Sequence, residues 1–399
     1  MSFMDRGRDG NGDRNKARVL IVRGAVLAVV FVCLVMATAG TVTAQDTVDV
    51  ADVEDLQAVS DAVDGEYVLV DDIDASGVDF EPIGDDEERF TGTFDGDGHV
   101  ITGLTVNRPD EEHVGMFGYV GSEGTVTEVG LEDVEVTGGD STGGLVGRNG
   151  GTVSRSHTTG AVEGGNNVGG LVGRNVGDID ESYTTAEVNG EDRVGGLVGR
   201  NVGDVDESYA AGTATGNSDV GGVVGSNAGE ITDSYSQTEV EGTSNVGGVV
   251  GSNVGGTVLG TYTAGKVGTA PASGGLVGRN TADIAESYWD TDATGQASSD
   301  AGTELTTEQM TGSDVLVYMD ALSFEETWEH TDGYPALAWE IHGYETESEM
   351  SLPPVETGDD DDTDEETDDY EPPGEGLPGF TVVAALVAVL AGAALVRSR

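Results

Sequence analysis

Residues 168–175 read Val-Gly-Gly-Leu-Val-Gly-Arg-Asn, and this phrase decides the fold because it recurs at a nearly fixed period. Copies begin 26 residues apart at positions 142, 168, 194, 220 and 246, and a last copy begins 27 residues later at position 273. A degenerate copy begins at Val114. A period of about 20–50 residues is typical of stacked units that are each too small to bury a core alone.

The composition of each unit predicts strands rather than helices. No apolar set recurs at helical spacing, and the three glycines of the phrase would each cost about 1 kcal/mol in a helix. The pair Asn189-Gly190 is a strong turn signal between short apolar segments. We therefore predict an all-β fold, a parallel β-solenoid of about seven coils stacked about 4.8 Å apart, with N- and C-terminal caps.

Stacking places equivalent residues of successive units in columns along the solenoid. The Asn that ends each phrase is expected to form a hydrogen-bonded ladder. A second column consists of tyrosines, each preceded by Ser or Thr, and alternation leaves open which of the two points inward. The arginines before the Asn form a third column, which we expect to pair with acids such as Asp180 and Glu181. The columns are Asn149, Asn175, Asn201, Asn227, Asn253 and Asn280; His157, Tyr183, Tyr209, Tyr235, Tyr262 and Tyr288; and Arg148, Arg174, Arg200 and Arg279.

Non-repeating segments flank the repeats of residues 114–289, and we expect them to cap the solenoid against edge-to-edge pairing. The N-terminal cap is predicted to span residues 45–113 and to contain a short helix over 52–63, where acids stand at the start and apolar residues share one face. The C-terminal cap is predicted to span residues 290–349. The aromatic residues available to cover that end are Phe324, Trp328, Tyr334 and Trp339.

The first 44 residues have the pattern of a secretory signal. Six basic residues precede an apolar run from Gly24 to Ala37, and we predict cleavage between Ala44 and Gln45. An N-terminal membrane anchor is the alternative, which the short apolar run disfavours. Cys33 is the only cysteine, so the mature protein has neither a disulfide nor a thiolate metal site.

The C-terminal residues combine an acidic linker with an apolar tail. Glu356–Glu371 contains eleven acids and predicts an extended, self-repelling linker within residues 350–377. Residues 378–399 begin with Pro378, Gly379 and Phe380 and continue as a 17-residue apolar run that two arginines follow. As a helix this run spans about 25 Å, enough for a transmembrane anchor with a cytoplasmic C-terminus. Residues 45–377 are then extracellular.

The charge of the chain is strongly negative, at −58 overall. Residues 45–377 hold 72 acidic residues against 9 basic ones, which gives −63. Such a charge repels itself in dilute buffer, whereas molar salt shortens the Debye length to about 3 Å. The composition therefore suits a halophile. Nucleic acid is excluded as a partner because the sequence offers no basic patch of the kind that binds it.

Two parts of the chain resemble known families. The repeated phrase, with Ser-Tyr about seven residues after its Asn, resembles the GLUG repeat of bacterial and archaeal surface proteins, including adhesin-like proteins. This resemblance covers roughly residues 85–340 and implies a surface β-solenoid. The segment from Pro378 to the terminal arginines resembles the PGF-CTERM tail of haloarchaeal surface proteins. That resemblance implies that an archaeosortase removes the helix and that a lipid replaces it.

The sequence holds few signs of chemistry. None of the five histidines stands in a His-Glu-x-x-His zinc motif. Residues 139–143 match the Gly-x-Ser-x-Gly elbow by letters, but they open a repeat, where a plain turn is expected. Residues 95–99 and 290–295 resemble the starts of calcium loops, yet Ala301 stands where the second loop needs a Glu. We therefore expect no cofactor, with calcium as the less favoured alternative.

Repeats, acidic linker and tail together predict a non-enzymatic cell-surface protein of a halophilic archaeon. Adhesion, cell-envelope structure or ligand display are the expected roles, with the membrane, an archaeosortase, surface glycans or other cells as partners. The alternative is a secreted β-helix polysaccharide lyase or hydrolase. Such an enzyme needs a few unique carboxylates in a groove, whereas the acids of this chain are spread evenly.

Overall fold

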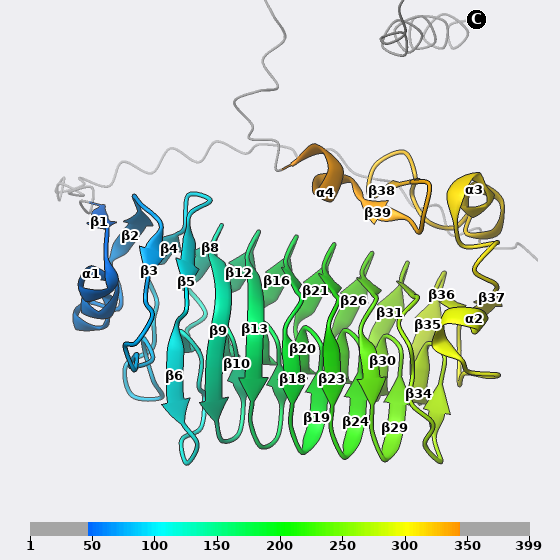
Figure 1. Cartoon of the computed structure of the whole chain (residues 1–399), viewed down its shortest axis with the longest axis horizontal. Coiled ribbons are helices and arrows are strands. Elements are labelled where there is room, and N and C mark those ends of the chain that lie inside the picture. Colours follow the sequence, from blue (N-terminus) through cyan, green and yellow to red (C-terminus); the bar gives the residue numbers. More distant parts are fainter. Residues whose placement is uncertain (1–46, 344–399) are drawn as a thin grey trace, which may run out of the picture. The chain divides into compact units, whose positions relative to one another are not determined.

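The computed structural model describes residues 47–343, which form a parallel β-solenoid (Figure 1). The predicted signal with Ala44 and Gln45, the acidic linker and the tail with Pro378, Gly379 and Phe380 lie outside the described residues. Within the described part, no helix is long and apolar enough to cross a membrane. The predicted fold class is confirmed, and one 26-residue repeat corresponds to one turn.

Each turn crosses four parallel sheets, whose strands pair in register with the same positions of the next turn. Val172 pairs with Val198 in sheet C, and Ile179 pairs with Val205 in sheet A. Sheet A contains β1 (Val48–Val50), β2 (Glu66–Leu69), β4 (Thr93–Asp95), β8 (Thr125–Thr127), β12 (Thr152–Ser154), β16 (Asp178–Asp180), β21 (Asp204–Asp206), β26 (Glu230–Thr232), β31 (Thr257–Leu259) and β35 (Asp283–Ala285). Sheet D contains β10 (Thr142–Gly143), β14 (Val168–Gly169), β19 (Asp192–Gly195), β24 (Ser218–Gly221), β29 (Ser244–Gly247) and β33 (Ser273–Gly274).

The other two sheets carry the arginine and tyrosine columns. Sheet C contains β7 (Phe117–Val120), β11 (Val146–Asn149), β15 (Val172–Asn175), β20 (Val198–Asn201), β25 (Val224–Asn227), β30 (Val250–Asn253) and β34 (Val277–Asn280). Sheet B contains β3 (Ile73–Asp74), β5 (Val100–Thr102), β6 (Thr105–Arg108), β9 (Gly130–Gly138), β13 (His157–Glu163), β17 (Tyr183–Thr184), β18 (Glu187–Asn189), β22 (Tyr209–Ala210), β23 (Thr213–Thr215), β27 (Tyr235–Ser236), β28 (Glu239–Glu241), β32 (Tyr262–Thr263), β36 (Tyr288–Asp290) and β37 (Thr303–Leu305).

The solenoid has about nine turns, whereas the repeats predicted seven. The additional turns precede Val114, where β1, β2 and β4 continue sheet A, and β3, β5 and β6 continue sheet B. These turns lack the glycine-rich phrase and do not extend sheet D, which begins at β10. A search for repeats therefore does not reveal them.

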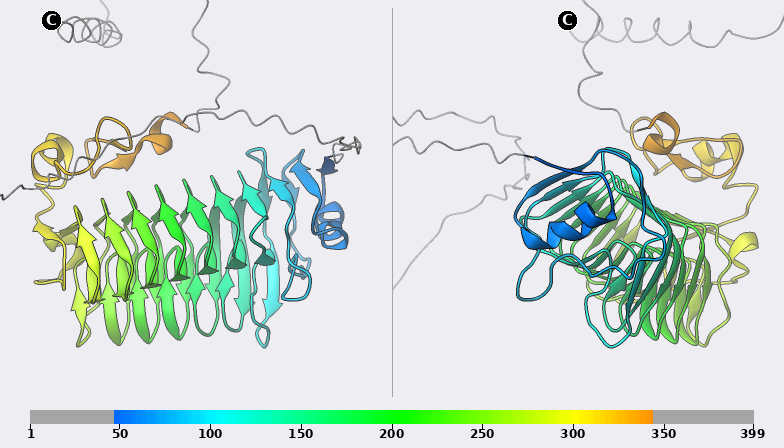
Figure 2. Two further views of the ribbon diagram at one scale, coloured as in Figure 1. Left: turned by 180° about the vertical axis from the view of Figure 1, so that it is seen from behind. Right: turned by 60° about the vertical axis from the view of Figure 1, so that its left-hand side comes forward.

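A short helix covers the N-terminal end of the solenoid, as predicted (Figure 2). It consists of α1 (Val53–Ala58) and a 3₁₀ turn, η1 (Val59–Asp61). The Asp52 side chain caps it by accepting hydrogen bonds from the backbone N–H groups of Glu54 and Asp55, at 2.9 and 3.0 Å. Leu56 is buried against the first turns.

The interior combines aliphatic side chains with two polar ladders. The Asn ladder is confirmed, because Asn175 Nδ2 donates to Asn201 Oδ1 at 2.9 Å and Asn201 Nδ2 donates to Asn227 Oδ1 at 3.0 Å. The question left open for the Ser and Tyr columns is also answered. Ser182 is fully buried and its Oγ donates to the Asp180 carbonyl at 2.7 Å, so the serines point inward and the tyrosines outward.

The glycines of the phrase let strands of sheets C and D pack with their backbones in close approach. A side-chain carbon added at Gly169 would collide with the carbonyl oxygen of Val172 within the same turn. One at Gly173 would lie 2.5 Å from the backbone of Ser141 in the preceding turn. Only glycine fits at these positions, which explains why the phrase recurs so strictly.

The C-terminal residues cover the last turn and then run back along the solenoid. Residues 291–305, with α2 (Thr291–Thr294), close the end, where Ser299 Oγ accepts a hydrogen bond from the Leu276 backbone at 3.2 Å. Residues 306–343, here called the C-terminal strap, contain η2 (Gly312–Asp314), α3 (Val315–Tyr318), the antiparallel pair β38 (Trp328–Glu329) and β39 (Ala336–Leu337), and α4 (Ala338–His342). The strap runs back along the solenoid (Figures 1 and 2). Its buried residues pack with Tyr235, Tyr262 and Tyr288.

The prediction that the C-terminal aromatics cover the end of the solenoid was therefore wrong. Trp328, Tyr334 and Trp339 pack on the side of the solenoid, against the outward tyrosines. The physical reason is that the stacked rings offer a long apolar surface to pack against. The last turn of the solenoid, in contrast, is already covered and hydrogen-bonded by residues 291–305.

Candidate functional site

The tyrosine column forms a continuous stack of rings on the outer face of sheet B. Register pairs Tyr183 with Tyr209, Tyr235 and Tyr262 in turn, and ring centroids of neighbours lie 4.8–5.0 Å apart with interplanar angles of 10° or less. His157 extends the stack, at 4.8 Å from the Tyr183 ring. The spacing matches the distance between turns, so the fold itself imposes the stacking.

The C-terminal strap covers one part of this stack. Trp328 is buried against the rings of Tyr235 and Tyr262, with centroids 6.1 and 5.5 Å apart. The Tyr235 hydroxyl donates to Glu340 Oε2 at 2.9 Å, and the Tyr262 hydroxyl donates to the Pro335 carbonyl. These contacts leave Tyr262 fully buried, although it lies on the outside of the solenoid.

The other part of the stack lies in a hollow of about 390 Å³, here called the aromatic groove. Its floor consists of the rings of His157, Tyr183 and Tyr209. The Arg155–Glu128 ion pair, with an N···O distance of 3.0 Å, borders it on one side. Trp339 and Glu340 of α4 border it on the other, with the Trp339 ring 5.9 Å from the Tyr209 ring.

The electrostatics of the groove follow from burial. Desolvation lowers the pKa of His157, so its ring is neutral at physiological pH, and it raises the pKa of Tyr183. Desolvation also raises the pKa of Glu340, against the hydrogen bonds from Leu337 and Tyr235 that lower it. The groove thus joins an apolar floor to charged walls, a combination that binds small polar ligands with an apolar face.

A column of carboxylates lies at the corner between sheets A and B, beside the strap. Asp180 pairs in register with Asp206, and Glu181 and Glu207 follow them with positive φ. Burial, and then the charges of Asp206, Glu181, Asp180 and Asp233, raise the pKa of Glu207 to about 7.

The strap is fastened to this corner through two indole groups. Trp339 Nε1 donates to the Glu207 carbonyl at 2.9 Å, and Trp328 Nε1 donates to Asp233 Oδ1 at 3.0 Å. Sequence reasoning did not foresee these contacts, because nothing in the repeats marks a tyrosine as covered. The only available signal was the set of aromatics between residues 324 and 339.

The remaining sequence-derived candidates lie apart from the groove. The carboxylate of Asp290, in the second calcium-like segment, accepts hydrogen bonds from Asp292 and Ala293 as the cap of α2. Asp95, in the first such segment, accepts from the Asp97 backbone at 2.9 Å. Ser141 lies in a corner with φ 63° and is followed by β10 rather than by a helix. Among residues 47–343, no group of three metal-ligating side chains comes together.

The arginine column does not pair with Asp180 and Glu181, so that prediction was wrong. The arginines stand on sheet C, whereas Asp180 belongs to sheet A, across the corner formed by the Asn ladder. The alternation of residues along the sequence could not predict that the arginines and Asp180 face different directions, because the chain turns a corner between them.

Comparison with known sequences finds similarity over part of the chain. No protein-family model matches this chain. Over 136 residues the chain is 38% identical to halomucin of Haloquadratum walsbyi, a match that covers 30% of this chain and 2% of halomucin. Over 96 residues it is 38% identical to a candidate Gly-rich membrane protein of Evansella cellulosilytica, covering 22% of this chain and 11% of that protein. The matches thus span a small part of either relative.

A solved structure gives a likeness over most of the described residues. The crystal structure of a candidate immunoglobulin A1 protease from Bacteroides ovatus superposes with a TM-score of 0.51 and 18% sequence identity. The match covers 74% of this chain and 94% of that one. At this identity the likeness shows a shared β-solenoid fold alone.

Proposed function

We propose that this chain is a non-enzymatic cell-surface protein of a halophilic archaeon that binds neutral sugar chains in the aromatic groove. The observation that carries the proposal is the groove itself, in which rings form the floor and Arg155, Glu128 and Glu340 stand around it. A sugar ring has an apolar face and a polar rim, and this arrangement complements both. Adhesion to glycans of other cells, or to the envelope of the same cell, follows from such binding.

The similarity to halomucin and to a Gly-rich membrane protein supports a place in the cell envelope. The net charge of −63 for residues 45–377 supports a halophilic source. We also propose that the repeats are of the GLUG type and are displayed at the cell surface. We propose further that residues 378–399 are a PGF-CTERM tail, through which an archaeosortase attaches the chain to the membrane.

Binding of neutral hexose oligosaccharides in molar salt tests the proposal. Tyr183→Ala removes part of the groove floor, and we expect it to weaken binding about tenfold, since aromatic contacts contribute about 1 kcal/mol or more. Glu187→Ala, on the exposed face of the same repeat, is the matched control and should bind like the wild type. Equal affinity of Y183A and wild type for every oligosaccharide that binds would refute the groove as the site.

The attachment is tested separately by mass spectrometry of the mature C-terminal peptide. Loss of the residues after Pro378, with a lipid in their place, is the expected result. A single acyl chain anchors only marginally, so a lipid with two long chains is expected. Intact Arg399 in mature membranes would leave the plain transmembrane anchor, and replacement of Pro378, Gly379 and Phe380 would then have no effect.

One observation favours a polysaccharide-cleaving enzyme as a second candidate. The pKa of Glu207, at about 7, is that of a general acid at neutral pH. However, Glu207 belongs to a repeated column, whereas glycoside cleavage needs a unique pair of carboxylates. Sugar cleavage by the wild type that Glu207→Gln abolishes would establish the enzyme and refute the non-enzymatic proposal.

A further inference from the structure

A column of arginines lies on the outer face of sheet C, away from the aromatic groove. Register places Arg148, Arg174 and Arg200 on consecutive turns, which are about 4.8 Å apart. Serines occupy the same position in the next two turns, and Arg279 ends the column. Tyr119 precedes it, and its ring is flanked by the guanidinium groups of Arg89 and Arg148 at 4.3 and 4.6 Å.

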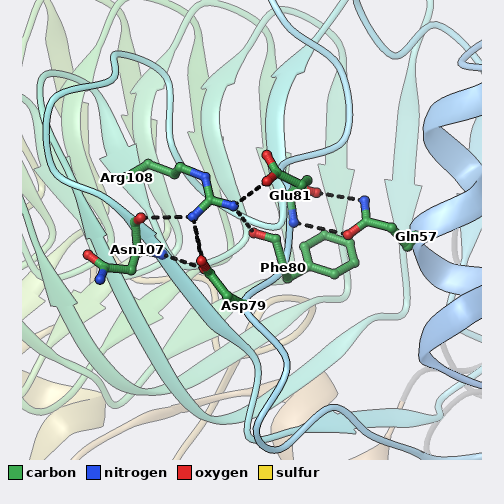
Figure 3. A network of polar contacts seen from close by, with 6 residues as sticks. All are labelled: Gln57, Asp79, Phe80, Glu81, Asn107 and Arg108. Atoms are coloured by element: carbon green, nitrogen blue, oxygen red, sulfur yellow. Dashed lines mark hydrogen bonds and ion pairs between the residues drawn. The ribbon is translucent and has the colours of Figure 1, made fainter.

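These arginines differ from Arg108, Arg155 and Lys266, which are ion-paired. Arg108 binds Asp79 and Glu81 at 2.9 and 2.6 Å (Figure 3), Arg155 binds Glu128, and Lys266 binds Glu239. By contrast, no carboxylate within residues 47–343 forms an ion pair with the arginines of the column. The Nε atoms of Arg148 and Arg174 are also buried without a hydrogen-bond partner in the described part of the chain.

Further cations lie near the column, in a protein whose overall charge is strongly negative. Arg193, in β19 of sheet D, donates to Asn167 Oδ1 at 2.7 Å and lines a hollow of about 310 Å³ with Arg200 and Arg279. Asp219 also lines this hollow, and its carboxylate accepts a hydrogen bond from Asn245 at 2.7 Å. Six of the nine basic residues between positions 47 and 343 thus lie in or near the column, although the sequence shows no basic patch, because these arginines are far apart along the chain. They are Arg89, Arg148, Arg174, Arg193, Arg200 and Arg279.

Placing like charges on consecutive turns is unfavourable unless something offsets it. Desolvation, followed by the charges of Arg148 and Arg200, lowers the pKa of Arg174, which reports this repulsion. Acidic residues are abundant among residues 47–343, yet none of them forms an ion pair with the column. An anion that binds from outside the solenoid would offset the repulsion between these arginines.

We propose that the arginine column, Arg148, Arg174, Arg200 and Arg279, binds a linear acidic polysaccharide that carries carboxylate or sulfate groups. A guanidinium group binds either anion through two parallel N–H···O bonds, and these short-range bonds persist where salt screens long-range attraction. The length of an extended pyranose unit is close to the distance between consecutive turns of the solenoid. Successive acid groups of one chain can therefore reach successive arginines, which favours a linear polymer over isolated anions.

Binding of polygalacturonate and of dextran sulfate to the full-length chain tests this proposal, with neutral dextran as the reference polymer. Arg174→Gln should weaken binding of at least one polyanion about tenfold, as expected for the loss of a charge-assisted bond. Lys266→Gln removes the same charge from an exposed ion pair and should have no effect. Ser226→Arg fills a gap in the column and should tighten binding, a gain that general damage to the fold cannot produce.

Three results would overturn the proposal. The first is equal affinity of the wild type and R174Q for both polyanions, and the second is an equal loss of affinity in K266Q. The third concerns the acidic segment of the same chain. A synthetic peptide of residues 356–371 that displaces the polyanions at lower concentration, and binds wild type but not R174Q, would assign this face to that segment. Y183A tests the aromatic groove and R174Q tests the arginine column, so a result that refutes one site does not refute the other.

Discussion

The tyrosine and arginine columns are built by the same repeat, yet the C-terminal strap covers part of the first and not the second. The tyrosines are stacked, and the C-terminal strap covers Tyr235 and Tyr262 until Tyr262 is fully buried. The arginines are stacked in the same register, but the described residues supply them with no carboxylate partner. The repeat therefore fixes which residues stack, whereas non-repeating segments decide which column is covered.

Detaching the C-terminal strap from the tyrosine column should have the largest effect on stability. Trp328 is buried between the tyrosine rings and Asp233, and truncating a buried Trp to Ala costs about 3–5 kcal/mol. Trp328→Ala should therefore release the strap, which limited proteolysis and hydrogen exchange of residues 306–343 would show. Leu316→Ala, at an exposed position of the same strap, should leave protection unchanged. If the strap of W328A stayed fully protected from proteolysis and hydrogen exchange, Trp328 would not be its anchor.

An inner column provides a reference for the two outer ones. Asn201→Ala should cost about 1–3 kcal/mol of unfolding free energy, because the buried amides of Asn175 and Asn227 each lose a partner. Denaturant unfolding measures this loss. Asn189→Ala, which removes an exposed side-chain hydrogen bond to Glu187, is the matched control and should change stability little. A loss below about 0.5 kcal/mol would mean that the ladder is not tightly coupled to stability.

The corner that holds the strap should respond to pH. The pKa of Glu207 is raised from 4.5 to about 7, so the folded state retains the proton longer than the unfolded state does. Its contribution to stability is present below pH 4.5 and is lost as the pH rises through about 7. Since water screens this partly buried group, we expect a loss of about 1–2 kcal/mol over that range.

Thermal unfolding of wild type and Glu207→Gln over this pH range measures the effect. The variant should show a smaller loss, since its amide does not ionise. Asp180, Glu181 and Asp233 have pKa values shifted in the same direction, so some pH dependence should remain. A wild type that grows more stable as the pH rises from 4.5 to 7 would contradict the assigned shifts.

The arginine column should show the smallest effect on stability. Arg174→Gln removes a charge that repels Arg148 and Arg200, so unfolding free energy should stay within about 0.5 kcal/mol of the wild type or rise slightly. Arg108→Gln is the contrasting variant, since it breaks ion pairs with Asp79 and Glu81 and should be destabilised by about 1 kcal/mol. A larger loss in R174Q than in R108Q would show that the column is structural.

Much of the fold was predictable from the sequence, because strict stacking repeats residues at one period. The Asn ladder, the parallel strands and the N-terminal helix follow from Asn175, Gly169 and Asp52 and were found as expected. The turns before Val114 were missed because they share the backbone path but not the glycine-rich phrase.

The candidate site was less accessible from the sequence. The strap contacts join residues about 100 positions apart, such as Tyr235 with Glu340, and no periodicity relates them. The arginine column was visible as a pattern, but its partners were assigned wrongly because Asp180 and Arg174 lie on different sheets. Position within a repeat therefore predicts a column, and only the folded chain shows what faces it.

Covalent footprinting of the full-length chain, read by mass spectrometry, tests the central difference between the two columns most directly. Tyrosine nitration and arginine modification by phenylglyoxal would be followed in one preparation in molar salt. We predict that Tyr183 reacts faster than Tyr262, and that Arg200 and Arg279 react faster than the ion-paired Arg108. Equal rates for Tyr183 and Tyr262, together with arginines of the column that are as protected as Arg108, would contradict a covered and an open column.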